Sequence, residues 1–264
     1  MPRPLITLLT DFGTEDHYVA AMKGVMLGIC PAAQLIDISH EIAPYAITEA
    51  AYTLSQAWAC FPQGTVHLVV VDPGVGSARR PIAVEAAGHR FVGPDNGVLT
   101  MLYEAVSGHE VREITAERFF RQPVSHTFHG RDIFAPVAAH LANGLATADL
   151  GQPIVDYVRL PFAKPAGIAE KIWNGTILKI DRFGNLITNF DSDGFAHIAE
   201  QPFELRIGWS VVSHVASNYA AMPPGELFVI AGSSGLLEIS ANQSSAAQML
   251  HARAGDSIEL RMLQ

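Results

Sequence analysis

Apolar residues in the first part of the chain alternate between short runs, as in strands, and longer stretches with helical spacing. The strand-like runs are expected at residues 5–9, 35–38 and 66–71, and the helices at 18–29, 46–59 and 133–141. Residues 82–86 and 90–92 are expected to pair as a hairpin. Because strands that alternate with helices favour parallel pairing, this part is predicted to be an α/β domain with a largely parallel central sheet.

The pattern changes to short alternating runs in the second part of the chain. Strands are expected at residues 172–180, 186–190, 203–207, 211–215, 227–230, 236–239 and 258–262, with turn residues between them. This spacing predicts a smaller, antiparallel, β-barrel-like domain. The expected organisation is an N-terminal domain over residues 1–162, a proline-containing linker at about 163–167, and a C-terminal domain over residues 168–264.

Composition fits a large folded core and excludes some partners. Hydrophobic residues make up 49% of the 264 positions and charged residues 16%, so a packed interior is expected and disorder is not. The formal net charge of -9 argues against nucleic acid as a partner. No apolar stretch is long enough to cross a membrane and no secretory signal is recognised, so a cytoplasmic location is expected. Cys30 and Cys60 both lie in apolar contexts and are expected to be buried and inert.

The end of the third predicted strand is the strongest candidate for a site. Three valines are followed by Asp72 and by a turn rich in proline and glycine, and Arg79 comes one short loop later. Open α/β sheets bind ligands just beyond the carboxyl ends of their strands. Asp72 and Arg79 are therefore predicted to form a polar pair at a ligand site.

Two further polar positions in the first part have both functional and structural interpretations. Asp11 follows the first strand, where a carboxylate can accept hydrogen bonds from ribose hydroxyls or can cap the following helix. His129 is a candidate proton carrier at neutral pH, although histidine often fills structural roles. Asp132 can cap the helix that follows it, and Arg131 can pair with Asp132 or with solvent.

The second part also carries polar groups beside glycines at strand ends. They lie in the segments 181–185 (Asp-Arg-Phe-Gly-Asn) and 233–238 (Ser-Ser-Gly-Leu-Leu-Glu), and ordinary turn chemistry is the alternative interpretation for both. No Walker loop, no dinucleotide-binding glycine motif and no zinc-ligand spacing is present, so the sequence supports no metal site.

Six of these segments occur in an order that resembles a known family. They are Thr10-Asp11-Phe12-Gly13, the segment from Asp72 to Ser77 with Arg79, Gly93-Pro94-Asp95-Asn96-Gly97, the segment from Thr127 to Asp132, and the two segments of the second part. Together they resemble the adenosine-forming S-adenosyl-L-methionine hydrolases, also called S-adenosylmethionine hydroxide adenosyltransferases, which are relatives of the fluorinase and the chlorinase. The resemblance extends over nearly the whole chain.

The resemblance implies an architecture and a set of partners. The family has an N-terminal α/β domain and a smaller C-terminal β-barrel-like domain. It forms homotrimers in which the ligand lies between the N-terminal domain of one subunit and the C-terminal domain of its neighbour. A small-molecule substrate is implied, with no cofactor, no metal, no nucleic acid and no membrane.

The resemblance also implies roles for individual residues. Asp72, Arg79 and His129 match the family's water-activating triad. The implied substrate-binding positions are Asp11 for the ribose, Tyr45 beside the ligand, Asp181 and Asn185 at the methionine portion or the adenine, Ser233 and Glu238 around the amino-acid end and the nucleoside, and Tyr219 in the adenine pocket.

The implied activity is hydrolysis of S-adenosyl-L-methionine to adenosine and L-methionine, with a preference for the (R)-sulfonium epimer. A halide-using 5′-halo-5′-deoxyadenosine synthase is the first competing function. The halogenases carry tyrosine at the position of Asp72 and serine at that of Gly130, which places this sequence on the hydrolase side. A non-catalytic sensor of adenosine or S-adenosylmethionine is the second competing function, and a metallohydrolase is a more distant third.

Overall fold

The computed structural model describes residues 3–263 and divides into two compact units, with the boundary between Leu160 and Pro161. This boundary precedes the linker expected at residues 163–167, and strand β8 (Ala166–Ala169) begins within that segment. The first unit therefore extends to Leu160, and the second begins at Pro161.

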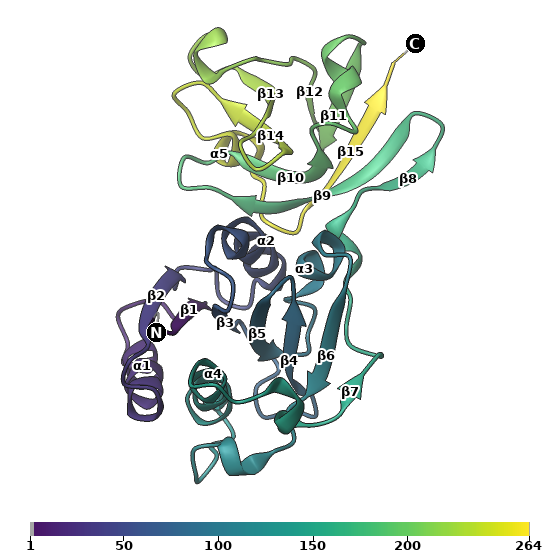
Figure 1. Ribbon diagram of the computed structural model, residues 1–264. Coiled ribbons are helices and arrows are strands. Elements are labelled where there is room, and N and C mark those ends of the chain that lie inside the picture. Colours follow the sequence, from purple (N-terminus) through teal and green to yellow (C-terminus); the bar gives the residue numbers. More distant parts are fainter. Residues whose placement is uncertain (1–2, 264) are drawn as a thin grey trace. The chain divides into compact units, whose positions relative to one another are not determined.

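The first unit is built on one mixed sheet (Figure 1). Over the described residues its strands are β1 (Leu5–Thr10), β2 (Gln34–Ser39), β3 (Val66–Val70), β4 (Pro81–Ala86), β5 (His89–Pro94), β6 (His109–Glu113) and β7 (Pro153–Ile154), in the order β2-β1-β3-β5-β4-β6-β7. The neighbours from β2 to β5 pair in parallel, and the pairs from β5 to β7 are antiparallel. The predicted α/β class and the β4–β5 hairpin are confirmed.

Helices cover both faces of this sheet. On one face α1 (Tyr18–Ile29) and α4 (Ala135–Ala142) bury side chains such as Met22 against strand residues such as Leu8 and Leu68. On the other face α2 (Ile47–Ala57) and α3 (Thr100–Ala105) pack over Val69 and Phe91. The central parallel strands β1 and β3 are buried on both sides, which explains why their sequences are mostly apolar, whereas the edge strand β2 is largely exposed.

The helix expected at residues 133–141 begins earlier and differently. A π-helical turn over Gly130–Phe134 comes first, and the α-helix follows from Ala135. Single π turns are frequent at functional sites. Here the turn directly follows His129.

The second unit is an antiparallel sheet that nearly closes on itself. Over the described residues its strands are β8, β9 (Ile172–Ile180), β10 (Leu186–Asp191), β11 (Phe203–Ile207), β12 (Ser210–Val212), β13 (Leu227–Ala231), β14 (Leu236–Ala241) and β15 (Ser257–Met262), in the order β12-β11-β15-β9-β10-β14-β13 with β8 on β9. Past β12, the N–H of Ala216 donates to the carbonyl of Val229 at 2.9 Å, which links the two edges of the sheet. The predicted β-barrel-like class is confirmed.

The remaining helical elements are short. They are α5 (Ala246–Leu250) and single turns at Trp58–Cys60, Glu117–Phe119, Thr147–Leu150, Pro161–Ala163, Ala196–Ala199 and Tyr219–Ala221. None of the helices between residues 3 and 263 has the length and apolar character needed to cross a membrane.

Two sequence expectations about individual segments were wrong. Cys60 is exposed, because it lies in a turn after α2 at the surface, whereas Cys30 is buried as expected. The strand expected at residues 211–215 ends at Val212, and Val215 forms only an isolated bridge to β13.

Candidate active site

The loop after β3 returns Arg79 to Asp72. The N–H of Val75 donates to the carbonyl of Asp72 at 3.2 Å and the N–H of Ser77 to that of Gly74 at 3.0 Å, so the chain reverses within a few residues. Gly76 has a φ of +76°, and a Cβ there would lie 2.3 Å from the carbonyl oxygen of His126. Only glycine therefore lets this loop lie against the segment that leads to His129.

Arg79 connects the two other members of the predicted triad. Its Nε donates to both Asp72 oxygens at 3.0 Å, and its Nη2 makes a further, short contact with Asp72 Oδ2. The same Nη2 lies 2.7 Å from His129 Nδ1. The Asp72 and Arg79 side chains are 4% and 9% exposed. The structure thus brings all three residues together around one guanidinium, which also lies over the Phe134 ring at 5.0 Å.

The contact with Arg79 determines the protonation of His129. An arginine guanidinium has only donors, so the Nδ1 of His129 must be an acceptor and carries no proton. The ring is then neutral, with its hydrogen on Nε2. Burial and, after it, the Arg79 charge lower the pKa of His129 below the usual range of histidine, which agrees with a neutral ring. His129 is therefore arranged to donate a hydrogen bond through Nε2.

Asp132 supports the segment around His129 and does not cap a helix. Its side chain is fully buried, and it pairs with Arg131 at 2.7 Å and Arg121 at 3.1 Å. It also accepts the N–H of Ser125 at 2.9 Å. Burial alone would raise the pKa of Asp132, but these hydrogen bonds outweigh it and the pKa is lowered. The expected pairing with Arg131 is confirmed, and the expected cap is wrong because the chain is already helical from Gly130.

Asp11 lies in the loop after β1. It does not cap α1, because that helix begins at Tyr18 with His17 at its N-cap. Instead its Oδ2 accepts the N–H of Tyr45 at 2.8 Å. Burial, and to a lesser degree the charge of Asp72, raises the pKa of Asp11. Tyr45 is 72% exposed and has a φ of 68°, a strained conformation for an aromatic residue of the kind that clusters at ligand sites.

A histidine that the sequence did not single out holds the loop of Asp11 at two points. His40 Nδ1 lies 2.8 Å from the Thr10 hydroxyl, and its carbonyl accepts the N–H of Gly13 at 2.8 Å. Asp37 contacts the other ring nitrogen of His40 at 3.0 Å. The residues on either side of Asp11 and Phe12 are thus attached to one buried residue, Thr10 to its side chain and Gly13 to its backbone.

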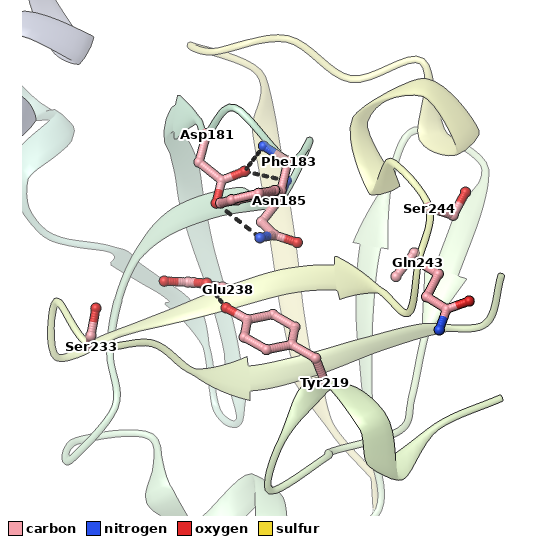
Figure 2. Close-up of a pocket in the computed structure, with 9 residues that line it drawn as sticks. Asp181, Phe183, Asn185, Tyr219, Ser233, Glu238, Gln243 and Ser244 are labelled. Carbon is pink, nitrogen blue, oxygen red and sulfur yellow. Dashed lines mark hydrogen bonds between the residues drawn. The ribbon is translucent and has the colours of Figure 1, made fainter. Parts of the chain in front are cut away.

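The second unit contains a cavity of about 670 Å³. All five of the predicted binding residues of this unit line it: Asp181, Asn185, Tyr219, Ser233 and Glu238 (Figure 2). It has the size of a small-molecule site and combines aromatic surface with a few converging polar groups. The sequence missed Phe183, Ala241, Gln243 and Ser244, which also line it.

Glu238 and Tyr219 meet across this cavity. The Tyr219 hydroxyl donates to Glu238 Oε2 at 3.1 Å (Figure 2). Burial, and then the neighbouring Asp181, raises the pKa of Glu238, and burial raises that of Tyr219 to about 12. A Cβ at Gly232 would lie 1.9 Å from Glu238 Oε1, so the glycine provides the space for this carboxylate.

Asp181 shapes the turn that forms one wall of the cavity. Its Oδ1 accepts the N–H groups of Phe183 at 2.8 Å and Asn185 at 2.9 Å, and its Oδ2 accepts the Asn185 amide at 2.9 Å. The turn interpretation is thus correct for Asp181, while Phe183 at the tip is 78% exposed. The sequence signal for Phe183 is its place in the same short turn as Asp181 and Asn185.

The ten predicted site residues therefore form two groups of five. Asp11, Tyr45, Asp72, Arg79 and His129 lie in the first unit, and the five cavity residues in the second. Among residues 3–263, no group of three His, Cys, Asp or Glu side chains is placed to hold a metal ion.

The first unit holds a buried carboxylate–arginine–histidine cluster, and the second holds a polar cavity. This combination is that of an enzyme that acts on a small molecule. Residues 6–151 match the model of the SAM hydroxide adenosyltransferase N-terminal domain, and residues 175–259 match that of the C-terminal domain. The chain belongs to the SAM hydroxide adenosyltransferase family.

Individual relatives agree with this assignment. The chain is 38% identical over 261 residues to the (R)-S-adenosyl-L-methionine hydrolase of Salinispora arenicola, covering 97% of each protein. It is 31% identical over 212 residues to the fluorinase of an Actinoplanes species, covering 70% of this chain and 71% of the relative. A crystal structure of an uncharacterized conserved protein from Thermotoga maritima is 40% identical, with a TM-score of 0.87 over 97% of this chain and 99% of the other.

Proposed function

We propose that this protein hydrolyses S-adenosyl-L-methionine, as its (R)-sulfonium epimer, to adenosine and L-methionine. The observation that carries the proposal is the bridge from Asp72 through Arg79 to His129, a buried arrangement that can hold and polarise one water molecule. Four curated relatives with 35% to 38% identity over nearly their full length are (R)-S-adenosyl-L-methionine hydrolases.

The chemistry requires activation of the nucleophile and not of the leaving group. The sulfonium of the substrate is positively charged, so methionine leaves ribose C5′ as a neutral thioether without a general acid. Water is a weak nucleophile at neutral pH. Attack forms the C5′–O bond, breaks the C5′–S bond and releases one proton from the water, which a base must accept.

We assign the base role to Asp72, and the donor and acceptor positions support this. The lone pair of His129 Nδ1 already accepts from Arg79, and Nε2 carries the hydrogen, so the neutral ring has no free acceptor. Asp72 Oδ1 accepts only from Arg79 Nε and retains acceptor capacity for a water proton. In this mechanism His129 donates a hydrogen bond to the water oxygen and orients it, Arg79 fixes both partners, and Asp72 takes the proton.

The substrate roles of the remaining residues form part of the same proposal. Asp11 accepts hydrogen bonds from the ribose hydroxyls, and the Tyr45 ring lies beside the ligand. In the second unit the cavity takes the adenine and the methionine portion, with Asp181 and Asn185 on one wall. Ser233, Tyr219 and Glu238 complete the contacts to the nucleoside and the amino-acid end.

We also propose a homotrimer in which each site combines the first unit of one subunit with the second unit of its neighbour. The division of the site residues between the two units supports this arrangement. Mixing the Asp72→Ala and Glu238→Ala variants tests it. In a mixed trimer, the first unit of a Glu238→Ala subunit and the second unit of an Asp72→Ala subunit are both intact, so together they restore a complete site. Activity that stays absent after the subunits have exchanged contradicts a shared site.

The surroundings of Gly130 favour water over halide as the nucleophile. A Cβ at this position would lie 3.2 Å from Met22 Sδ and 3.5 Å from the Phe12 ring, so the serine of the halogenases would require Met22 to shift. The fluorinase relatives are also less similar to this chain, at 31% identity or lower. A chloride-dependent product from S-adenosylmethionine would reverse this conclusion.

The direct test is chromatography of each sulfonium epimer after incubation with the purified protein. We expect adenosine and methionine from the (R) epimer. Binding by calorimetry without product would instead support a sensor, and activity abolished by a chelator would support a metallohydrolase. A reducing, cytoplasmic location is proposed as well, supported by the two free cysteines.

A further inference from the structure

One segment quoted for the family resemblance has no role in the mechanism described so far. This is the segment Gly93-Pro94-Asp95-Asn96-Gly97, at the end of β5. Asp95 is 6% exposed, which is unusual for a carboxylate and requires compensating partners. Asn96 contacts Val71, which directly precedes Asp72, and Asp95 contacts Arg80, which directly follows Arg79.

Asn96 holds the chain immediately before Asp72. Its amide Nδ2 donates to the carbonyl of Val71 at 2.9 Å. Its Oδ1 accepts the N–H of Val98 at 3.1 Å, so both ends of the amide are engaged and its orientation is fixed. Val71 has already left β3 and is itself completely buried. The Asn96 amide thus gives this carbonyl a partner where the sheet ends.

Asp95 holds the chain immediately after Arg79. The N–H of Asp95 donates to the carbonyl of Arg80 at 2.9 Å, and the Arg80 guanidinium donates to Asp95 Oδ2 at 2.7 Å and 3.0 Å. Asp95 Oδ1 accepts the N–H of Val158 at 2.8 Å. Backbone and side chain of one residue therefore attach Arg80 from two directions.

Two glycines of the segment lie where a side chain would collide with neighbouring residues. A Cβ at Gly93 would lie 2.6 Å from the carbonyl oxygen of Val69 in β3. Gly97 has a φ of +93°, and a Cβ there would lie 2.4 Å from the Leu160 side chain. Both positions are closed to larger residues, and Gly93 is the one that places the segment against the strand that leads to Asp72.

We propose that Asp95 and Asn96 are positioning residues that clamp both ends of the loop from Asp72 to Arg79 and thereby set the carboxylate–guanidinium geometry. Neither touches the reacting atoms. This role rests on the proposed function, because it serves the alignment of the water held by Asp72 and His129. A misplacement of a catalytic group by about 1 Å can cost roughly 100-fold in rate, so the clamp acts on kcat and leaves substrate binding unchanged.

The main test is Asn96→Asp, which keeps the shape and the acceptor for Val98 but places an oxygen against the Val71 carbonyl. We expect kcat to fall roughly 100-fold with KM unchanged. Hydrogen exchange measured by mass spectrometry should become faster in residues 71–80, where the turn N–H groups report on the loop. This second readout does not depend on catalysis.

Asn189 provides a matched control. It is also buried, its Nδ2 donates to the carbonyl of Phe162 at 3.0 Å, and its Oδ1 accepts the N–H of Thr176 at 2.8 Å. Asn189→Asp therefore makes the same chemical change in the second unit. It should reduce stability while leaving kcat and the exchange of residues 71–80 as in the wild type.

A second pair of variants changes the two carboxylates that pair with Arg80. Asp95 and Asp156 both pair with its guanidinium, but Asp95 is buried at the strand end and Asp156 is exposed. Asp95→Asn should lower kcat and loosen residues 71–80, and Asp156→Asn should do neither. This pair decides the question if Asn96→Asp does not fold.

The outcomes separate the clamp from the proposed function. Wild-type kcat and exchange in both Asn96→Asp and Asp95→Asn would overturn the clamp, as would an equal loss of kcat in Asn189→Asp. Faster exchange in residues 71–80 of Asn96→Asp, in a protein whose wild type forms no adenosine, would support the clamp and refute the proposed function.

Discussion

Replacing His129 by asparagine distinguishes a hydrogen-bond donor from a general base. An asparagine side chain places its amide oxygen near the position of Nδ1, where it can still accept from Arg79 Nη2, which lies 2.7 Å from Nδ1 in the wild type. It cannot carry a proton away, and it loses the Nε2 donor. If His129 only donates to the water, the cost of this substitution is one neutral hydrogen bond, about 1 kcal/mol, or about fivefold in kcat.

His129→Ala and Asp72→Asn complete the series. The alanine also leaves Arg79 Nη2 without its acceptor, and a hydrogen bond from a charged group adds about 2 kcal/mol, for a total loss of roughly 100-fold. Removal of the base in Asp72→Asn should cost about 10²- to 10⁴-fold. The kcat values are therefore expected to fall from wild type to His129→Asn to His129→Ala, with Asp72→Asn equal to His129→Ala or lower.

Adenosine release from (R)-S-adenosylmethionine under saturating conditions measures this series. Thermal unfolding of each variant checks that the first unit is folded. A loss of more than about 100-fold in His129→Asn, equal to that in His129→Ala, would refute the reasoning and assign the base role to His129.

Three further predictions follow from the protonation of buried groups. Because burial lowers the pKa of His129 below its usual 6.5, the acid limb of kcat should be centred below pH 6.5; a limb centred above 6.5 would contradict a neutral His129. Glu238→Gln keeps a partner for Tyr219 but removes the charge, so KM should rise while thermal stability stays within about 1 kcal/mol of the wild type, as measured by kinetics and melting. Burial lowers the pKa of His67 from 6.5 to about 3 in the folded state. The contribution of His67 to folding stability is therefore fully present above pH 6.5 and falls towards pH 3 by up to about 1.4 kcal/mol per pH unit. Urea unfolding of His67→Gln at several pH values should show a pH dependence that is smaller by this contribution.

The helices and central strands of the first unit could be predicted because burial fixes their apolar pattern: α1 buries one face, and β1 and β3 are buried on both. The helix over residues 18–29 was predicted with its observed bounds, and the β4–β5 hairpin within two residues. The π-helical turn at Gly130–Phe134 was not predicted, and within it the buried Asp132 pairs with Arg131 and with Arg121, eleven positions earlier in the chain. Local propensity contains no information about such a partner.

In the candidate site, too, contacts between residues close in sequence could be predicted and contacts between distant residues could not. Asp72 and Arg79 could be paired from sequence because one short loop joins them. The contact of Arg79 with His129, fifty positions later, came only from the family resemblance, and the structure adds the donor and acceptor roles within it. His40 was missed because its two contacts, to Thr10 and Gly13, join segments that the sequence keeps apart.

Hydrolysis in water enriched in oxygen-18 tests the central claim most directly. The purified protein is incubated with (R)-S-adenosylmethionine, and the adenosine and methionine formed are analysed by mass spectrometry. If Asp72, Arg79 and His129 direct water to ribose C5′, the adenosine carries one heavy oxygen at its 5′ position and the methionine carries none. Unlabelled adenosine, a 5′-halogenated nucleoside, or no product at all would contradict the account.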